Sequence, residues 1–319
     1  MMRVGAIDNP HSQRNKQRAS GLEAAGREVE GFRYARLDDM ADLPAILADL
    51  AHKDLELLVI SGGDGTVQAV LTELIEARPF ERLPVLAILP RGMTNMTASD
   101  IGIGGDKGLR RLFELCRSGE LSSGHLHRRH LLRLENIRDY GPQVGMFFGG
   151  AGIYRAIETC RQSIHSLKFE SELANGLTLA ALLLRWLFTR GRNDQVLKGD
   201  RADIKLDDEV FGERDYLLFL ATTLDRLVLR SRPFWNIGGR PIRYTSIAYP
   251  PRRLLRSARR VLYGGDDRRL PSDCYLSRGA ERVELTLSSP FTLDGQLFEP
   301  DPAHPLVLTA RHSADFVKL

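Results

Sequence analysis

The sequence predicts two domains, an α/β domain with a parallel sheet followed by a domain of antiparallel strands arranged as a β-sandwich. Two observations predict this fold class. Over the first 120 residues, strand-like and helix-like segments alternate, which is typical of βαβ units. From about residue 125, short strand-like runs separated by turn residues follow one another. The expected domains are residues 1–124 and 125–319, and a return of the last residues to the first domain is left open.

The elements of the first domain are predicted from local hydrophobic patterns. Continuous apolar runs between turn residues indicate buried strands, and apolar residues three and four apart indicate helices packed on one side. The expected strands are 3–8, 57–61 and 85–89, and the expected helices are residues near 12–26, 41–51, 67–77 and 109–116. Ligands of parallel sheets bind at the carboxyl ends of the strands. We therefore expect the turns after Asp8, Ser61 and Leu89 to converge on one crevice.

Seven short runs predict the strands of the second domain, with one helical insertion near 173–189. These runs are 131–134, 145–148, 202–206, 216–221, 242–247, 282–287 and 306–309. The apolar stretch within the insertion either packs in the core or lines a cleft for an acyl chain. In the second case the lining candidates are Leu182, Leu183, Trp186 and Leu187.

The composition excludes several classes of protein. The chain has 319 residues, 43% hydrophobic and 27% charged, with a formal net charge of +4, as in globular proteins with a sizeable core. Cys116, Cys160 and Cys274 are odd in number and far apart, which argues against a disulfide framework. The apolar stretch 177–184 is too short to span a bilayer, and the start has no signal-peptide pattern. A cytoplasmic location is expected, with peripheral attachment to membrane left open.

A basic segment interleaves arginines with apolar residues. On a helix, this spacing places a basic face beside an apolar face, which is typical of contact with an anionic membrane surface or a nucleic-acid backbone. Few aromatic residues accompany the arginines, so we expect no nucleic-acid partner. The alternative is an ordinary solvated helix. The arginines are Arg252, Arg253, Arg256, Arg259 and Arg260. Whether the chain forms a homodimer is left open.

A glycine-rich loop, Gly62-Gly63-Asp64-Gly65-Thr66, joins the expected strand 57–61 to the expected helix 67–77. Such a turn leaves backbone N–H groups free at a helix N-terminus, where phosphate binds. The alternative is a turn that merely needs positive φ angles. A carboxylate in a phosphate-binding turn repels the anion unless it holds a metal or takes a proton. Asp64 therefore points to chemistry.

Three further motifs accompany this loop. They are Asn9-Pro10-His11-Ser12, then Leu89-Pro90-Arg91-Gly92-Met93-Thr94-Asn95 with Ala98-Ser99-Asp100-Ile101-Gly102, and late in the chain Leu293-Asp294-Gly295-Gln296. In order and spacing, the four motifs resemble the diacylglycerol kinase catalytic domain family, which includes bacterial lipid kinases, sphingosine kinases and ceramide kinases. The resemblance covers nearly the whole chain.

The resemblance implies an ATP-dependent kinase that uses Mg²⁺ and phosphorylates a hydroxyl of a diacylglycerol or sphingoid-like lipid in phospholipid metabolism. It implies an α/β domain similar to that of NAD kinases and phosphofructokinases, with ATP in the crevice between the domains. By resemblance, Asn9 contacts the phosphates. The triphosphate is cradled by Gly62, Gly63, Asp64, Gly65 and Thr66, and the other wall is lined by Gly92, Thr94 and Asn95.

The chain departs from the family pattern at three places. After the glycine-rich loop, the family's frequent Asn-Glu is Gln68-Ala69. The usual Gly-Thr-x-Asn reads Gly92-Met93-Thr94-Asn95, and the Glu that serves the family as general base is Gln296. An amide cannot accept a proton at neutral pH. Asp64, Asp294 or Glu299 are the candidates to replace that base. Two alternatives remain open, a nucleotide- or lipid-binding protein without turnover and an NAD kinase. The metal ligands are not predicted.

Overall fold

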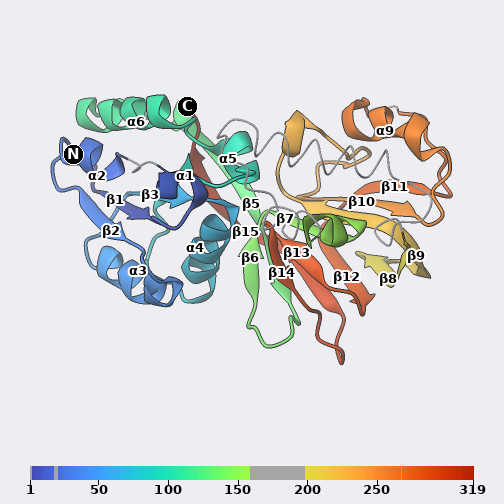
Figure 1. The fold of residues 1–319 in the computed structure, drawn as a ribbon. Coiled ribbons are helices and arrows are strands. Elements are labelled where there is room, and N and C mark those ends of the chain that lie inside the picture. The colour runs from blue at the N-terminus through green and yellow to red at the C-terminus, as the bar shows by residue number, and fades with distance from the viewer. Residues whose placement is uncertain (1, 18–20, 159–197, 267) are drawn as a thin grey trace. The chain divides into compact units, whose positions relative to one another are not determined.

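The computed structural model describes residues 2–17, 21–158, 198–266 and 268–319 (Figure 1). The chain divides into two compact units, Met1–Arg129 with His312–Leu319 (unit 1) and His130–Arg311 (unit 2). The insertion expected near 173–189, with its four lining candidates, lies outside the described residues. None of the helices within the described ranges is both long and apolar enough to cross a membrane.

Unit 1 is built on a parallel sheet, as predicted. Its strands lie in the order β2 (Arg33–Arg36), β1 (Val4–Asp8), β3 (Leu57–Gly62) and β4 (Val85–Pro90). The end of β15 (Leu306–Val317) adds a parallel neighbour to β4, where Phe316 pairs with Leu86. All residues of β1 and β3 are buried, so the continuous apolar runs in the sequence reflect strands covered on both faces.

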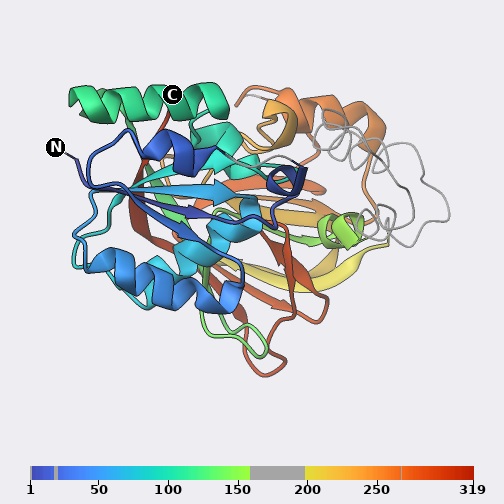
Figure 2. The ribbon, with the colours of Figure 1, turned by 60° about the vertical axis from the view of Figure 1, so that its left-hand side comes forward.

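Helices cover both faces of this sheet (Figures 1 and 2). On one face lie α3 (Leu43–Ala51) and α4 (Asp64–Glu76), and on the other lie α2 (Leu22–Gly26) and α6 (Asp106–Ser118). The short elements α1 (Gln13–Gln17), η1 (Met40–Asp42), α5 (Met96–Ile101) and η2 (Ser123–His125) complete the unit. Both α4 and α6 begin three residues before their predicted starts, because a first turn is polar and carries no hydrophobic periodicity.

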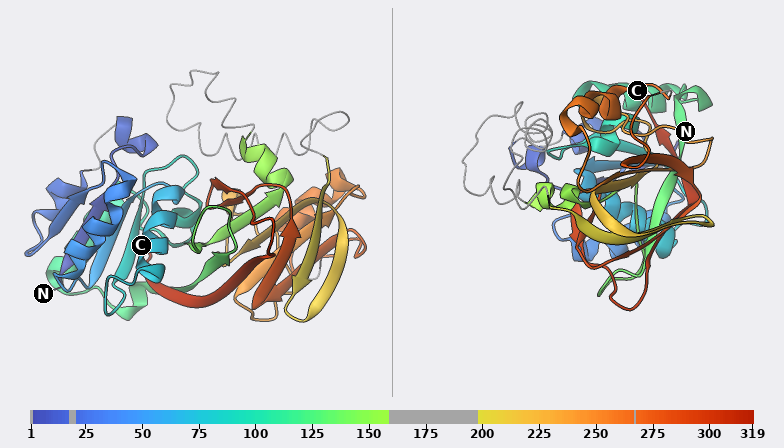
Figure 3. Two further views of the ribbon diagram at one scale, coloured as in Figure 1. Left: turned by 90° about the horizontal axis from the view of Figure 1, so that it is seen from below. Right: turned by 90° about the vertical axis from the view of Figure 1, so that its right-hand side faces the viewer.

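Unit 2 consists of antiparallel strands, which confirms the predicted fold class. Its main strand order is β14-β13-β7-β9-β8-β12-β15. Outside this order, β10 pairs with β9 and β11, and β5 pairs with β15 and β6. The strands β8 and β12 lie side by side in Figure 3. Their bounds are β5 Leu126–Glu135, β6 Gln143–Gly145, β7 Phe147–Ala151, β8 Asp200–Leu206, β9 Glu209–Thr222, β10 Ile242–Ala248, β11 Tyr275–Ala280, β12 Arg282–Leu287, β13 Phe291–Leu293 and β14 Gln296–Phe298.

Alternate residues of the strands in unit 2 face two different cores. Tyr216 and Tyr244 face the main core, which also contains Phe148, Phe219 and Phe291. The opposite face of β9, β10 and β11 packs against α9 (Leu254–Tyr263), the helix formed by the basic segment. Successive side chains of a strand point to opposite faces, so one face of these strands packs in the main core and the other packs against α9. The remaining element is η4 (Val228–Arg230).

Candidate functional site

Three loops of unit 1 meet at the carboxyl ends of the parallel strands, as the sequence predicts. The side-chain amide of Asn9, after β1, donates to Thr66 Oγ1 in the first turn of α4, which follows β3 (2.9 Å). The N–H of Arg91, after β4, donates to the Gly62 carbonyl (2.9 Å), and the Arg91 carbonyl accepts from the N–H of Arg14 (2.9 Å). These contacts join the first three predicted motifs into one cluster.

The glycines of two of these loops are required by close packing. Gly62 ends β3, Gly63 precedes α4 with a φ of −89°, and neither residue adopts a positive φ. A Cβ on Gly63 would lie 3.0 Å from Gly92 Cα, and a Cβ on Gly92 would lie 2.5 Å from Gly63 Cα. Because both neighbours are backbone atoms, a side chain at Gly92 would force the two loops apart. The glycines bring two backbones together, a reason different from the positive φ considered above.

The loop after β3 leaves donors at the start of α4. The N–H groups of Thr66 and Val67 bond to the Gly63 carbonyl, at 3.0 and 3.1 Å. The N–H groups of Asp64 and Gly65, the first two residues of α4, have no acceptor within the helix. Two backbone donors at the positive end of a helix form a site that favours an anion.

Asp64 joins α4 to the next helix. Its two carboxylate oxygens accept hydrogen bonds from the backbone N–H groups of Met96 and Thr97, each 3.0 Å long, in the first turn of α5. Burial raises the pKa of this carboxyl above its ordinary value of 3.8, and the backbone hydrogen bonds oppose that rise. The role of general base stays a prediction. The contacts of Asp64 favour a different role, that of an anchor between two loops.

Asn95 holds the turn after β4. It has a left-handed backbone (φ 47°), its side-chain oxygen accepts from the Gly92 N–H (2.7 Å), and its amide donates to the Gly92 carbonyl (2.6 Å). The side chain is buried, so both of its polar ends serve the loop. Thr94 and Met93 are half-buried beside it. Among the described residues the hydroxyl of Thr94 has no hydrogen-bond partner, so a ligand can use it.

A buried polar network below Asn9 was missed by the sequence analysis. The side-chain amide of Asn15 donates to Asp8 Oδ1 (2.9 Å), to the Asn9 carbonyl (2.7 Å) and to Ser61 Oγ (3.3 Å). The hydroxyl of Tyr34 donates to Asp8 Oδ2 (3.1 Å), and burial with the nearby carboxylate raises the pKa of Tyr34 to about 12. The sequence did contain one signal for this network, because Asp8 is a charged residue at the end of an otherwise apolar strand. This network fixes the turn that carries Asn9.

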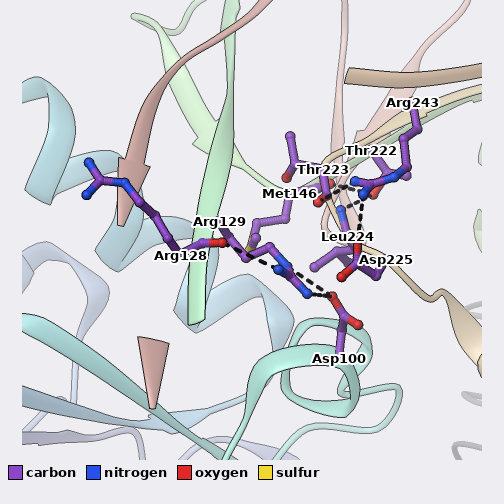
Figure 4. A network of polar contacts seen from close by, with 9 residues as sticks. All are labelled: Asp100, Arg128, Arg129, Met146, Thr222, Thr223, Leu224, Asp225 and Arg243. Carbon is purple, nitrogen blue, oxygen red and sulfur yellow. Dashed lines mark hydrogen bonds and ion pairs between the residues drawn. The ribbon is translucent and has the colours of Figure 1, made fainter. Parts of the chain in front are cut away.

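Another buried carboxylate of unit 1 lies in α5. Asp100 is 2% exposed and forms an ion pair with Arg129 at 3.5 Å (Figure 4). At the start of α6, Asp106 forms an ion pair with Arg91 at 2.5 Å. Arg129 thus contacts α5 and Arg91 contacts α6, and both helices border the loop cluster. The sequence motif containing Asp100 therefore has a structural function in addition to any contact with a ligand.

The late motif forms a tight hairpin turn in unit 2. Asp294 (φ 46°) and Gly295 (φ 83°) both adopt left-handed backbone angles between the paired strands β13 and β14. Such two-residue turns favour Asp-Gly. The Asp294 carboxylate is 3% exposed and accepts from the backbone N–H groups of Met146 and Phe147, each 2.9 Å. The hairpin is thereby fixed to the start of β7.

The backbone segment that Asp294 contacts, at Met146 and Phe147, is itself held by hydrogen bonds in unit 2 (Figure 4). The Met146 carbonyl accepts from the Thr222 hydroxyl (2.8 Å) and from the Thr223 N–H (3.1 Å). Arg243 then donates to the Thr223 carbonyl (2.9 Å) and to Asp225 (2.5 Å). The position of Asp294 therefore depends on a network that extends to the ends of β9 and β10.

Gln296, at the position where the resemblance implies a general base, begins β14 and is exposed. Glu299, another candidate base, forms an ion pair with Arg138. Both Glu299 and Arg138 border a cavity of about 350 Å³ with Tyr140, Tyr154 and Phe298. Within the described parts of the chain, no group of three or more His, Cys, Asp or Glu side chains is arranged to hold a metal ion.

Comparison with known proteins finds a family match in the first part of the chain. Residues 3–126 match the family model of the diacylglycerol kinase catalytic domain. This match confirms the resemblance that the motifs within these residues indicate. A curated relative, described as a YegS-like lipid kinase from Enterobacter sp. (strain 638), is 27% identical over 139 residues. That match spans 44% of this chain and 43% of the relative, less than half the length of either protein.

Solved structures show the same fold over the whole chain. A Bacillus anthracis protein assigned as a diacylglycerol kinase superposes with a TM-score of 0.66 at 16% identity, over 99% of this chain and 96% of that chain. Yeast NADH kinase complexed with NADH gives a TM-score of 0.50 at 12% identity, over 100% of this chain and 84% of that chain. At such identities the likeness concerns the fold alone, an α/β unit followed by antiparallel strands.

Proposed function

We propose that this protein is an ATP-dependent lipid kinase that transfers the γ-phosphoryl group to a hydroxyl of a diacylglycerol or sphingoid-like lipid. The match of residues 3–126 to the diacylglycerol kinase catalytic domain supports a lipid kinase. The observation that carries the proposal is the cluster of three loops, in which the start of α4 packs against the Gly92 turn and Asn9 bonds to Thr66. Phosphoryl transfer depends mainly on such positioning and on electrostatic stabilisation.

The loop cluster fits the phosphates of a nucleotide. The N–H groups of Asp64 and Gly65 supply donors at a helix N-terminus, and a Cβ on Gly63 or Gly92 would crowd the facing loop. Asn9 and Thr94 supply polar side chains on the two sides. Mg²⁺ is usually held by one or two carboxylates together with the substrate phosphates, so it fits as a companion of ATP. When bound, it would neutralise charge on the phosphates.

The missing base predicts a slow enzyme. Loss of a general base typically lowers a rate by about 10²- to 10⁴-fold, and both Asp64 and Asp294 already accept two backbone hydrogen bonds each. Gln296 is exposed at the hairpin, so Gln296→Glu is tolerated sterically. We expect this variant to raise turnover. An unchanged turnover, together with unchanged ATP binding, would favour a binding protein without catalysis.

The primary test is incubation of the purified protein with γ-labelled ATP, Mg²⁺ and separate lipid classes in mixed micelles. A labelled product in the organic phase supports the proposal and names the acceptor class. NAD is included as a water-soluble acceptor, because formation of labelled NADP without any lipid product would assign the chain as an NAD kinase. ATP binding without product across all acceptors would refute the proposed activity.

A matched pair of glycine variants tests the loop cluster. Gly63→Ala introduces a Cβ 3.0 Å from Gly92 Cα, whereas Gly141→Ala introduces one with no atom within 4 Å. We expect Gly63→Ala to weaken ATP binding at least tenfold and Gly141→Ala to leave it unchanged, as measured by calorimetry. Equal affinity of the two variants would show that the nucleotide binds elsewhere.

A further inference from the structure

The basic segment forms a helix, α9, with apolar side chains that pack against the strands of its own unit. Leu254, Ser257 and Val261 lie three and four residues apart on α9 and face the strands of unit 2. Leu254 and Val261 pack in the core that also contains Trp235 and Tyr275. A helix that inserts into a lipid surface needs a free apolar face. Leu254 and Val261 are covered by the unit itself, so these two apolar side chains are not available for insertion.

The helix is held firmly at both ends. At its C-terminus the Arg268 guanidinium donates to the carbonyls of Arg260 (3.0 Å), Val261 (2.5 Å) and Gly264, and it stacks over the ring of Trp235 at 4.8 Å. At its N-terminus the Tyr275 hydroxyl donates to the Arg252 carbonyl (2.7 Å). Cations that satisfy the last carbonyls of a helix stabilise it. The helix is therefore a fixed element before any partner binds.

The outward face of α9 is cationic and unneutralised. Arg253, Arg256, Arg259 and Arg260 are exposed, and in the described part of the chain none of them has an ion-pair partner. Arg252 beside them pairs with Asp273 at 2.9 Å, on the surface. The ten residues of α9 include no acidic side chain. The arrangement differs from that of α6, where Asp106 and Glu114 alternate with the basic residues.

We infer that this face docks the protein on an anionic lipid surface through electrostatic contact with head groups. The inference rests on the proposed function, since a lipid acceptor lies in a bilayer. Charge complementarity carries it, because four unneutralised arginines on a rigid helix match a layer of phosphates. A single-stranded nucleic acid usually requires stacking aromatics. The exposed aromatic residue of this helix is Tyr263, whose hydroxyl contacts the Leu229 carbonyl (3.4 Å).

The test is flotation of the full-length protein with vesicles, without ATP. The vesicles are pure phosphatidylcholine or phosphatidylcholine with 30% phosphatidylglycerol. The test variant carries Arg256→Gln, Arg259→Gln and Arg260→Gln. The matched control carries Lys107→Gln, Arg110→Gln and Arg111→Gln, three exposed basic residues of α6. Both variants lose the same charge, so net charge cannot explain a difference between them.

We expect the wild type and the α6 variant to bind only the anionic vesicles, with release at high salt. Each basic side chain near such a surface strengthens binding by roughly fivefold, so the α9 variant should bind about 100-fold more weakly. Equal binding by the two variants would overturn the inference. Retention of the wild type on DNA but not on vesicles would overturn it as well, by assigning the face to nucleic acid.

Activity on a short-chain lipid in detergent separates this inference from the proposed function. The α9 variant should keep the wild-type rate on a dispersed acceptor and lose rate on vesicles. A loss of rate on both acceptors would show that α9 contributes to the kinase itself and would overturn the docking role. Vesicle binding by a protein that has no kinase activity would leave docking supported and refute the kinase.

Discussion

The loop after β3 and the hairpin between β13 and β14 both place an aspartate before a glycine, and they use the pair differently. Asp64 and Asp294 each accept two hydrogen bonds from consecutive backbone N–H groups, at 2.9 to 3.0 Å. Gly65 continues a helix, whereas Gly295 occupies a left-handed angle in a tight turn. The same two letters therefore specify a helix start in one unit and a hairpin in the other.

The glycines show the same contrast. Gly63 and Gly92 have backbone angles open to any residue, but a facing backbone leaves no room for a side chain. Gly295 has open space around the position of a Cβ, and only its φ of +83° restricts the residue type. A glycine required by crowding marks a place where two loops meet. A glycine required by a positive φ indicates only a local turn of the backbone.

The largest expected effect is at Asp294. Asp294→Ala leaves the N–H groups of Met146 and Phe147 without acceptors in a buried site and places alanine at a left-handed angle. We expect the free energy of unfolding to fall by about 4 kcal/mol, measured by urea denaturation. Asp294→Asn tolerates the angle and keeps one acceptor, so it should lose about half as much. Equal losses would contradict the anchoring role.

Gly92→Ala should have the next largest effect. Its Cβ would meet the Gly63 backbone at 2.5 Å, which neither loop can relieve without separating. We expect a loss of about 2 kcal/mol in the free energy of unfolding, together with weaker ATP binding. Urea denaturation and calorimetry measure the two effects. A stable variant with normal ATP affinity would show that the close approach of the loops is unnecessary.

Asp64→Asn should cost about 1.5 kcal/mol near pH 4, because an amide NH₂ cannot accept from the Met96 or Thr97 N–H. Burial raises the folded-state pKa of Asp64 above 3.8. The stability that comes from this shift is therefore fully present below pH 3.8 and is lost as the pH rises through the raised pKa. The difference between the two proteins should shrink accordingly in urea titrations between pH 4 and 7.

The Asp64→Asn variant also distinguishes the two possible roles of Asp64, a structural anchor and a general base. A difference in stability that grows with pH would show that the two amides hold Asp64 charged. Loss of activity at unchanged stability would identify Asp64 as the base. Parallel loss of stability and activity would identify it as an anchor.

The smallest expected effect is at Gly295. Gly295→Ala meets no atom within 4 Å, so only the left-handed angle opposes it, at about 1 kcal/mol. Gly295→Asn should be close to neutral, because asparagine adopts that angle more readily. The midpoints of urea denaturation compare the two. A larger loss in Gly295→Ala than in Gly92→Ala would reverse the contrast between the glycines.

Most of unit 1 could be predicted from the sequence because its strands are covered on both faces and read as unbroken apolar runs. β2 was missed, since its exposed ends are arginines, Arg33 and Arg36, and α5 was missed because one and a half turns carry no clear periodicity. In unit 2 the longer strands were predicted except β11, Tyr275–Ala280, which was missed. The three-residue strands β13 and β14 are too short to produce a signal.

The predicted site residues of unit 1 converge because the order of parallel strands brings their ends together. What the sequence does not reveal is the use of each polar group. Asn95 and Asp64 satisfy neighbouring backbone, and Asn15 joins the cluster from a helix that contains no motif. Such assignments depend on which N–H groups are left without partners by distant parts of the chain. Local pattern contains no information about them.

The sheet of unit 1 takes its last strand from the far end of the sequence. Phe316 of β15 is buried beside β4, and Val317 packs in the same core as β1 and β3. During synthesis, this edge of the sheet stays unpaired until all of unit 2 has left the ribosome. An unpaired edge of β4 is a template for pairing with another chain. The nascent protein is therefore most prone to aggregation just before its final strand arrives, and expression of residues 1–129 alone should give an insoluble product.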